Sequence, residues 1–303
     1  MENSNTIGRR ELCRTALACS GLLAVPGGLS LAASGSSAHQ LDPDRPEDLL
    51  RAHVKMRYSL GPELNIGWLR GKRFAVSEGR VEPLCGMLAA TLSRLHKVSE
   101  HEYEFTVLEV TVYTDLETGE LLDTLVMPFS GEEVEIPVHR FGPVPVRFAV
   151  ALDETEHYTP KPGTTQAQFA TAGTVSMTKS IERDHERDGN LYLRHEEYGR
   201  RYPEGSDIPS LFYRETTLWS APTAQVLDPQ IDSVASHVNY SAMTSWRPYM
   251  KMGDIPGHTF SNGFGGRARS IDELPADYRD IVNRVHPDVL RDPEGALGPP
   301  AAS

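Results

Sequence analysis

The stretch EYEFTVLEVTVY, residues 102–113, decides the fold class of this chain. Its run of aromatic, β-branched and other apolar residues is typical of a β-strand, in which side chains alternate between two faces. One face carries a carboxylate among aromatic and aliphatic side chains: Tyr103, Phe105, Val107, Glu109, Thr111 and Tyr113. The other face is aliphatic at Leu108, Val110 and Val112. Because both faces hold apolar residues, we expect the strand to be covered on both sides or to contain a bulge.

Similar runs continue along much of the chain, separated by Gly, Pro, Asp and Asn. They span residues 121–127, 132–141, 144–152, 190–200, 211–219 and 236–246. Asp188 and Gly189 have the composition of a hairpin turn between two strands, and no helical pattern long enough for a crossover lies between strands. The sequence therefore predicts an antiparallel all-β barrel or sandwich. Of the two, we favour a barrel-like domain of the calycin or lipocalin type.

One helix is expected at each end of this β region. Asp44 can cap the first helix, Pro46 lies in its first turn, and apolar residues at helical spacing continue towards Tyr58. Pro275 marks the first turn of the second helix, which runs to Val285. We expect both helices to flank the barrel and to pack on its outside.

The sequence predicts a single domain over residues 41–293. The final run DPEGALGPPAAS is expected to leave a disordered tail over 294–303. Residues 154–178 contain few apolar side chains, so we expect a long loop there, either a lid or an internal boundary. The glycine-rich run GFGGR, residues 263–267, is expected to form a tight turn.

The N-terminus predicts the compartment. Arg9 and Arg10 form a twin-arginine pair, residues 15–34 are weakly apolar, and small residues at 36–38 suit a cleavage site. These features are typical of an export signal rather than a membrane anchor. We expect residues 1–38 to be a twin-arginine (Tat) signal peptide, the Tat translocon to be a partner during export, and the mature protein to be periplasmic. No later run reaches the roughly 18 apolar residues that a membrane-spanning helix needs.

The net charge of the mature chain argues against two classes of binding partner. The 303-residue chain has a formal net charge of −12, and the signal contributes +1 from three arginines and two glutamates, so the mature chain carries −13. We therefore expect neither nucleic acid nor an anionic membrane as a partner.

The cysteine content bears on how the domain is stabilised. Cys13 and Cys19 leave with the signal, and only Cys85 remains. No intramolecular disulfide can form, so an ordinary apolar core must stabilise the domain.

Two segments of the mature chain are distinctive. They are EVTVYTDLETGELLDTLVMPFSGEEVEIPVHRFGPV, residues 109–144, and SWRPYMKMGDIPG, residues 245–257. Together they resemble the bacterial and fungal family called domain of unknown function 1838 (DUF1838), over about residues 41–293. The chain departs from the family pattern at Leu125 and Met127, where a tryptophan and an asparagine usually precede the proline. The resemblance implies one globular domain and carries no chemistry of its own.

The sequence contains no G-x-S-x-G elbow, HExxH, paired CxxC, P-loop or G-x-G-x-x-G motif after a strand. His195 and Glu197 share a strand face at a spacing that could hold a metal, but no third ligand is identifiable. We therefore predict neither a metal nor a cofactor.

Glu109 is the strongest candidate for chemistry. A carboxylate on an inward aromatic face loses solvation, which favours its protonated form and makes it a usable general acid or base. The alternative is a buried ion pair with Arg140 or Arg194. His139 lies on a later strand and is the second candidate for proton transfer, although a lone strand histidine can instead be a structural hydrogen-bonding residue.

The segment WRPYMKMGDIPG, residues 246–257, is expected to form a rigid wall of the main pocket, because it combines aromatic and methionine side chains with prolines and glycines. Lys251 is the third catalytic candidate, as a desolvated base or amine. It can instead lay its stem on apolar surface and steer an anionic or phenolic ligand at the pocket mouth. Substrate-binding aromatic side chains are expected at Tyr103, Tyr113, Trp246 and Tyr249.

These residues predict a cofactor-independent periplasmic enzyme of lyase, isomerase or hydratase type. Its substrate would be a small hydrophobic or aromatic molecule bound inside the barrel. The alternative is a lipocalin-like carrier that binds such a molecule without changing it. The arrangement of Glu109 and His139 discriminates between the two, because a paired acid/base mechanism requires both side chains to face the same cavity.

Overall fold

A computed structural model describes residues 40–99, 101–159, 172–205 and 210–298. The described residues form one compact unit. The expected signal peptide, with Arg9 and Arg10, lies outside the described residues, as does the central part of the loop expected over 154–178.

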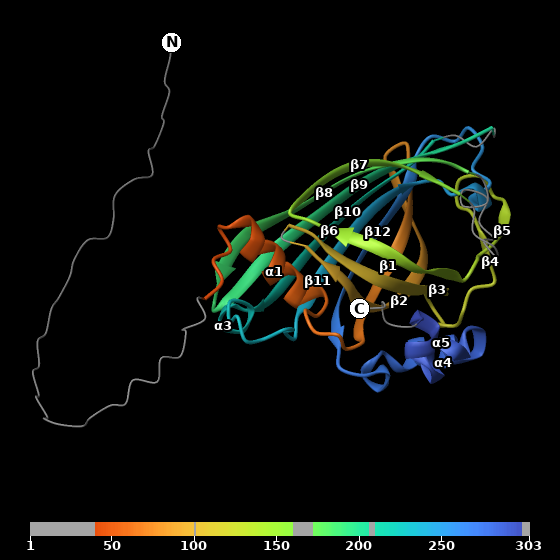
Figure 1. Ribbon diagram of the computed structural model, residues 1–303. Helices are drawn as coiled ribbons and strands as arrows, with labels where there is room; N and C mark the ends of the chain where they lie inside the picture. Colours follow the sequence, from red (N-terminus) through yellow and green to blue (C-terminus); the bar gives the residue numbers. More distant parts are fainter. Residues whose placement is uncertain (1–39, 100, 160–171, 206–209, 299–303) are drawn as a thin grey trace, which may run out of the picture. The chain divides into compact units, whose positions relative to one another are not determined.

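Ten antiparallel strands form one sheet, which curls into a nearly closed barrel (Figure 1). The strands are β1 (Asn65–Ser77), β2 (Arg80–Val98), β3 (Tyr103–Thr114), β6 (His139–Phe148), β7 (Ala151–Tyr158), β8 (Gly173–Arg187), β9 (Asn190–Pro203), β10 (Leu211–Pro222), β11 (His237–Ser245) and β12 (His258–Ala268). Their order in the sheet is β6-β3-β2-β1-β12-β11-β10-β9-β8-β7, so the first and last strands of the chain pair with each other. The predicted antiparallel all-β barrel is confirmed.

The sequence analysis did not predict β1, β2, β8 or β12. In β12 the glycine-rich sequence was interpreted as a turn. Residues 263–267 lie in this strand, between β1 and β11, and do not form the expected tight turn. A Cβ atom at Gly265 would lie 1.9 Å from the carbonyl oxygen of Trp68, so no side chain fits where these two backbones approach. The loop expected over 154–178 is shorter than predicted, because β7 extends to Tyr158 and β8 begins at Gly173.

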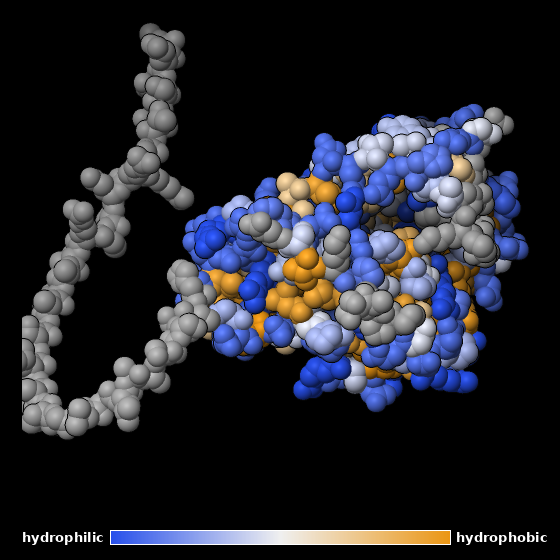
Figure 2. Space-filling view, viewed as in Figure 1, coloured by the Kyte–Doolittle hydropathy of each residue, from blue (hydrophilic) through white to orange (hydrophobic). Residues whose placement is uncertain are grey.

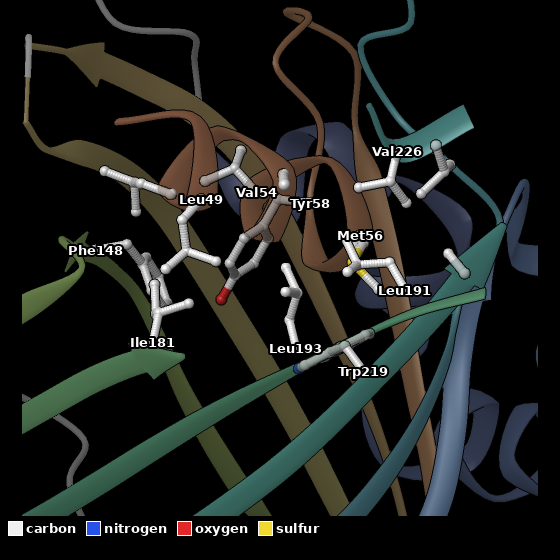
Figure 3. Packing of buried hydrophobic residues seen from close by; sticks show 14 of the residues in the cluster. Leu49, Val54, Met56, Tyr58, Phe148, Ile181, Leu191, Leu193, Trp219 and Val226 are labelled. Carbon is white, nitrogen blue, oxygen red and sulfur yellow. The ribbon is translucent and has the colours of Figure 1, made fainter. Parts of the chain in front are cut away.

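Helix α1 (Pro46–Arg57) forms where it was predicted but packs inside one end of the barrel, not outside it. Leu50, Ala52, Val54 and Met56 are each at most 1% exposed. Side chains of α1 form one apolar cluster with residues of the surrounding strands (Figure 3): Phe148, Ile181, Leu191, Leu193 and Trp219. The expectation of an outer helix was wrong because an apolar stripe shows that a helix is buried, but not on which side of the sheet.

A buried lysine ties α1 to the next helix. The Lys55 side chain is 0% exposed, and its Nζ donates to the carbonyl oxygens of Gln225 (3.2 Å), Val226 and Asp228 (2.6 Å). These acceptors lie at and just after the end of the short helix α3 (Thr223–Val226). Lys55 therefore supplies donors to the carbonyl groups that the end of a helix leaves without partners.

Helix α4 (Ala276–Val285) packs outside the barrel, as predicted, and covers the aliphatic face of β3. One apolar cluster joins the two elements: Tyr278, Ile281, Val282, Leu108, Val110 and Val112. The Tyr278 hydroxyl donates to the carbonyl oxygen of Val110 at 3.1 Å. This contact explains why both faces of β3 are apolar, since one faces the barrel interior and the other faces α4.

Three short helices accompany α4. They are η2 (Ile271–Glu273), α5 (Pro287–Arg291) and α6 (Pro293–Leu297). Leu297 is 1% exposed and belongs to the same cluster as α4. The beginning of the tail that was expected to be disordered is therefore a packed helix.

Short segments pack at the end of the barrel opposite α1 (Figure 1). They are the hairpin of β4 (Thr124–Val126) and β5 (Glu133–Glu135) and the 3₁₀ helix η1 (Pro248–Met250). Their buried side chains form a third apolar cluster with residues of the barrel: Met127, Val134, Met250, Met252, Met87 and Tyr113. The interior between the two apolar ends is left for polar groups.

Candidate functional site

Between its two apolar ends the barrel encloses two adjoining cavities. One has a volume of about 130 Å³ and is lined partly by Tyr58, Leu69 and Trp219, and we call it the α1-side cavity. The other, of about 170 Å³, is more polar and is bordered by Arg247 and Tyr249, and we call it the η1-side cavity. The residues that line both are Met87, Glu109, Thr111, Glu215 and Tyr240. Figure 2 shows a hollow in the molecular surface towards the end of the barrel that carries β5.

Glu109 projects into the interior from the middle of β3, and its Oε1 accepts a hydrogen bond of 2.9 Å from the Thr111 hydroxyl. His139, at the start of β6, lies opposite Thr111 in the strand pairing. Glu109 and His139 both line the η1-side cavity. Burial lowers the pKa of His139, an effect that Glu109 opposes and that Arg247 and Arg73 strengthen. The imidazole is therefore neutral at pH 7 and can accept a proton.

Neither arginine considered as an ion-pair partner of Glu109 fulfils that role. Arg140 pairs with Asp288 of α5 at 2.8 Å, and Arg194 pairs with Asp184. Among the described residues Glu109 forms no ion pair, so its carboxyl group faces the cavity with Thr111 as its hydrogen-bond donor.

Glu215 faces the interior from β10 and lies opposite Glu197 in the pairing of β10 with β9. Burial raises the pKa of Glu215 to about 7; the negative charges of Glu197 and Glu109 add to this shift, and Arg57 opposes it. The side chain keeps some accessible surface despite its depth, because it lines both cavities. At neutral pH this carboxyl group is partly protonated and partly ionised, which suits it to exchange protons.

The sequence prediction missed Glu215, although its signal is the same as that of Glu109. Alternation along LFYRETTLW, residues 211–219, again places a carboxylate among aromatic side chains: Tyr213, Glu215, Thr217 and Trp219 share one face. The Tyr213 hydroxyl donates to Glu197, and the Lys179 Nζ lies 3.8 Å from the same carboxylate. Glu215 thus lies beside a group of interacting polar side chains formed by Glu197, Tyr213 and Lys179.

Two arginines that were not predicted also line the η1-side cavity. Arg73, on β1, donates from Nε to the Ser261 hydroxyl (3.1 Å) and from Nη1 to the Tyr113 hydroxyl (2.8 Å). Its guanidinium carbon lies 4.7 Å from the centroid of the Tyr113 ring. Arg247 is the extended residue immediately before η1. Within the described ranges, neither guanidinium group has a carboxylate as an ion-pair partner.

The segment 246–257 borders the η1-side cavity through Arg247 and Tyr249 and not through Lys251. Lys251 takes a left-handed backbone conformation (φ 49°) directly after η1, and it is exposed. Its Nζ donates to the carbonyl oxygen of Glu133 at 3.3 Å, and it lines neither cavity. The catalytic role predicted for Lys251 therefore has no support from its position.

Of the four aromatic residues expected to bind substrate, Tyr113 and Tyr249 line the η1-side cavity. Trp246 lies behind the cavity wall, where its indole nitrogen donates to the carbonyl oxygen of Ile255 at 3.0 Å. Tyr103 is half-buried against the apolar cluster at the α1 end and lines neither cavity. Of the four predicted residues, only Tyr113 and Tyr249 are therefore placed to contact a ligand in the η1-side cavity.

His195, considered as half of a metal site with Glu197, is instead buried beside α1. Its Nδ1 lies 3.0 Å from Nη1 of Arg57, and its ring centroid is 5.3 Å from that of His53. Burial lowers the pKa of His195, helped by Arg57, and burial also lowers the pKa of His53 to about 3. The part of the chain that the structure describes contains no group of three or more His, Cys, Asp or Glu side chains that could hold a metal ion.

Comparison with known proteins places the chain in a family. In the described ranges no helix has both the length and the apolar character needed to cross a membrane. A search of the curated proteins finds no match. A family model described as "Protein of unknown function (DUF1838)" matches residues 63–301, which include both segments that carry the resemblance. The chain therefore belongs to the DUF1838 family.

Proposed function

We propose that the barrel is an enzyme of lyase, isomerase or hydratase type, which moves protons on a small hydrophobic or aromatic molecule. One observation carries the proposal: Glu109, Glu215 and His139 all line the η1-side cavity. A carrier requires a cavity and orienting groups, but it does not require three proton-transfer groups around one space. All the groups that such a reaction uses are supplied by the chain itself.

The roles follow from the positions of the three groups and from the pKa shifts of Glu215 and His139. An isomerase, a lyase and a hydratase each take a proton from one atom, of the substrate or of a water molecule, and give a proton to another atom or to the leaving group, so they need an acid and a base that face the same space. Glu215, with a pKa of about 7, can serve as the acid when protonated. Glu109 would act as the base, and the neutral His139 offers a second acceptor beside it. The apolar clusters at the two ends of the barrel would limit the access of bulk water to the reacting atoms.

We also propose that this chemistry takes place in the periplasm. The support is the pair Arg9 and Arg10 at the start of an apolar, small-residue N-terminal segment, which is typical of Tat export.

The proposal is tested with the metabolite that accumulates when the gene is deleted. The purified mature protein should convert this metabolite, and in D2O an isomerisation or a hydration should leave deuterium from the solvent in the product. Glu109→Gln and Glu215→Gln should each lower the rate by about 100-fold or more, because each removes a proton-transfer group. Glu104→Gln is the matched control, since Glu104 lies on the same strand but faces away from the interior.

The carrier alternative predicts a different result in the same experiment. If the metabolite binds in a one-to-one complex and is recovered unchanged, with no exchange of deuterium, the protein is a carrier and the enzyme proposal is wrong.

A further inference from the structure

The guanidinium groups of Arg73 and Arg247 face the η1-side cavity without a carboxylate as an ion-pair partner among the described residues. Arg140, which is also partly buried, pairs by contrast with Asp288 at 2.8 Å. A charge withdrawn from bulk water costs free energy unless an opposite charge or strong hydrogen bonds compensate it. An anionic group of a ligand would supply the partner that the two interior guanidinium groups lack.

The wall around the two arginines is rich in hydrogen-bond donors. Tyr240 and Tyr249 line the same cavity. Burial raises the pKa of both phenols, so their hydroxyl groups remain protonated at neutral pH. A guanidinium group has five N–H donors, and the Ser261 and Tyr113 hydroxyls each accept one from Arg73. This wall therefore offers donors to an acceptor that a ligand must provide.

The charge balance favours a ligand group with one negative charge. The η1-side cavity is lined by two guanidinium groups and two carboxyl groups, those of Glu109 and Glu215. Because the pKa of Glu215 is about 7, its carboxyl group is protonated in part of the molecules at neutral pH. A carboxylate restores the balance and matches the planar guanidinium group in a bidentate pair. A phosphate monoester would bring a second negative charge towards Glu109.

The α1-side cavity can hold the apolar part of the same ligand. Leu69, Trp219 and Val238 are among the residues that line it, and its volume is about 130 Å³. A cavity of comparable size, about 150 Å³, accommodates a benzene ring. Glu109 and Glu215 line both cavities, so they stand where the two spaces adjoin.

We infer that the ligand of the barrel is a small aryl- or alkyl-carboxylate, whose carboxylate group binds Arg73 and Arg247 and whose apolar group occupies the α1-side cavity. This inference rests on the proposed function for the use of the site and adds the substrate class. In this orientation the carbon atoms next to the carboxylate lie beside Glu109 and Glu215, where a proton can be removed or added.

Matched pairs of acids and amides test the inference. Phenylacetate is compared with phenylacetamide, and cinnamate with cinnamamide, by isothermal titration calorimetry of the mature protein at pH 7; phenyl phosphate serves as the dianionic probe. Each carboxylate should bind at least about tenfold more tightly than its amide, because only the carboxylate pairs with the guanidinium groups. Equal affinity of acid and amide, tighter binding of phenyl phosphate, or no binding by any probe would overturn the inference.

Variants then locate the carboxylate. Arg247→Met should reduce the preference for acid over amide to about twofold or less, because methionine keeps much of the apolar stem and removes the charge. Arg80→Met is the matched control: Arg80 is exposed at the start of β2 and pairs with Glu82, so the preference should persist. A folded Arg247→Met protein that keeps the full preference contradicts the inference. Thermal unfolding shows whether each variant is folded. The comparison of acids with amides on the wild-type protein does not depend on any variant.

The tests of the inference and of the proposed function give distinguishable failures. If carboxylates are preferred but the protein converts neither a carboxylate nor the accumulated metabolite, the enzyme proposal fails and the inference stands. If the protein converts a neutral compound, Glu109→Gln abolishes that conversion and no preference for carboxylates exists, the inference fails and the enzyme proposal stands.

Discussion

Glu215 shows how the barrel sets the protonation of a single residue. Its carboxyl group lies opposite Glu197 on the neighbouring strand and lines the cavities with Glu109, so ionisation places a negative charge beside other negative charges, away from bulk water. Its pKa rises from 4.5 to about 7. A glutamate on the surface would be almost fully ionised at pH 7, so the raised pKa makes Glu215 a source of pH-dependent stability as well as a candidate acid.

Because the folded protein binds this proton more tightly than the unfolded chain, Glu215 stabilises the fold below about pH 4.5, and this contribution is lost as the pH rises through about 7. Glu215→Gln cannot titrate. The free energy of unfolding of the wild type should therefore fall by up to roughly 3 kcal/mol more than that of the variant between pH 4.5 and pH 8. Urea unfolding at both pH values measures the difference. If the free energy of unfolding changed equally with pH in the two proteins, the raised pKa of Glu215 would be contradicted.

At the scale of one element, α1 closes the barrel from within and carries polar side chains into an apolar environment. His53 is 0% exposed, and neither of its ring nitrogens has a hydrogen-bond partner within the described ranges. Its ring lies 5.3 Å from that of His195, between centroids. Protonation of either imidazole would bury a charge beside Arg57, so it would destabilise the packing of α1 in the barrel.

Since burial lowers the pKa of His53 from 6.5 to about 3, its neutral form supports the fold above pH 6.5, and this contribution is lost as the pH falls from 6.5 towards 3. His53→Leu should remove this loss of stability at low pH. It also removes two buried nitrogens without hydrogen-bond partners, which should raise the free energy of unfolding by about 1–3 kcal/mol. We expect a higher thermal midpoint at pH 7 and a lower midpoint pH of acid unfolding, followed by circular dichroism. His237→Leu, at an exposed position, is the control. An unchanged acid midpoint in His53→Leu would show that this ring does not limit stability.

For the molecule as a whole, a barrel with apolar clusters at both ends places its polar groups in the centre. Strands from both halves of the chain contribute to that centre: Arg73 comes from β1, Glu109 from β3 and Glu215 from β10. The pairing of β1 with β12 holds these strands in one sheet. The site therefore requires that the whole sheet curl, and no single hairpin contains it.

The proposed Tat signal gives a prediction about the location of the protein in the cell. With both Arg9→Lys and Arg10→Lys, the protein should remain in the cytoplasm, because a twin-arginine signal requires its arginine pair. Cell fractionation with an antibody against the mature chain measures the periplasmic share, which should fall at least about tenfold. Arg14→Lys conserves the pair and is the control. An unchanged periplasmic share in the double variant would exclude Tat export.

The sequence by itself determined the strand character of β3, its two apolar faces and the positions of α1 and α4, because these depend on local periodicity and on prolines. Alternation also placed Glu109 on a strand face with aromatic side chains, and the same alternation in β10 contains the signal for Glu215. These features are properties of neighbouring residues, so they can be read without knowing what each element packs against.

Only the tertiary structure decided which groups meet. Glu109, Glu215, Arg73 and Arg247 come together because of strand register and the curling of the sheet, which depend on pairing between residues far apart in the chain. The side of the sheet on which α1 lies was likewise set by the space inside the barrel. In the segment 246–257, the left-handed turn at Lys251 leaves that side chain exposed while Arg247 reaches the cavity. Composition alone could not distinguish these two cations, because the direction of a side chain follows from the backbone that carries it.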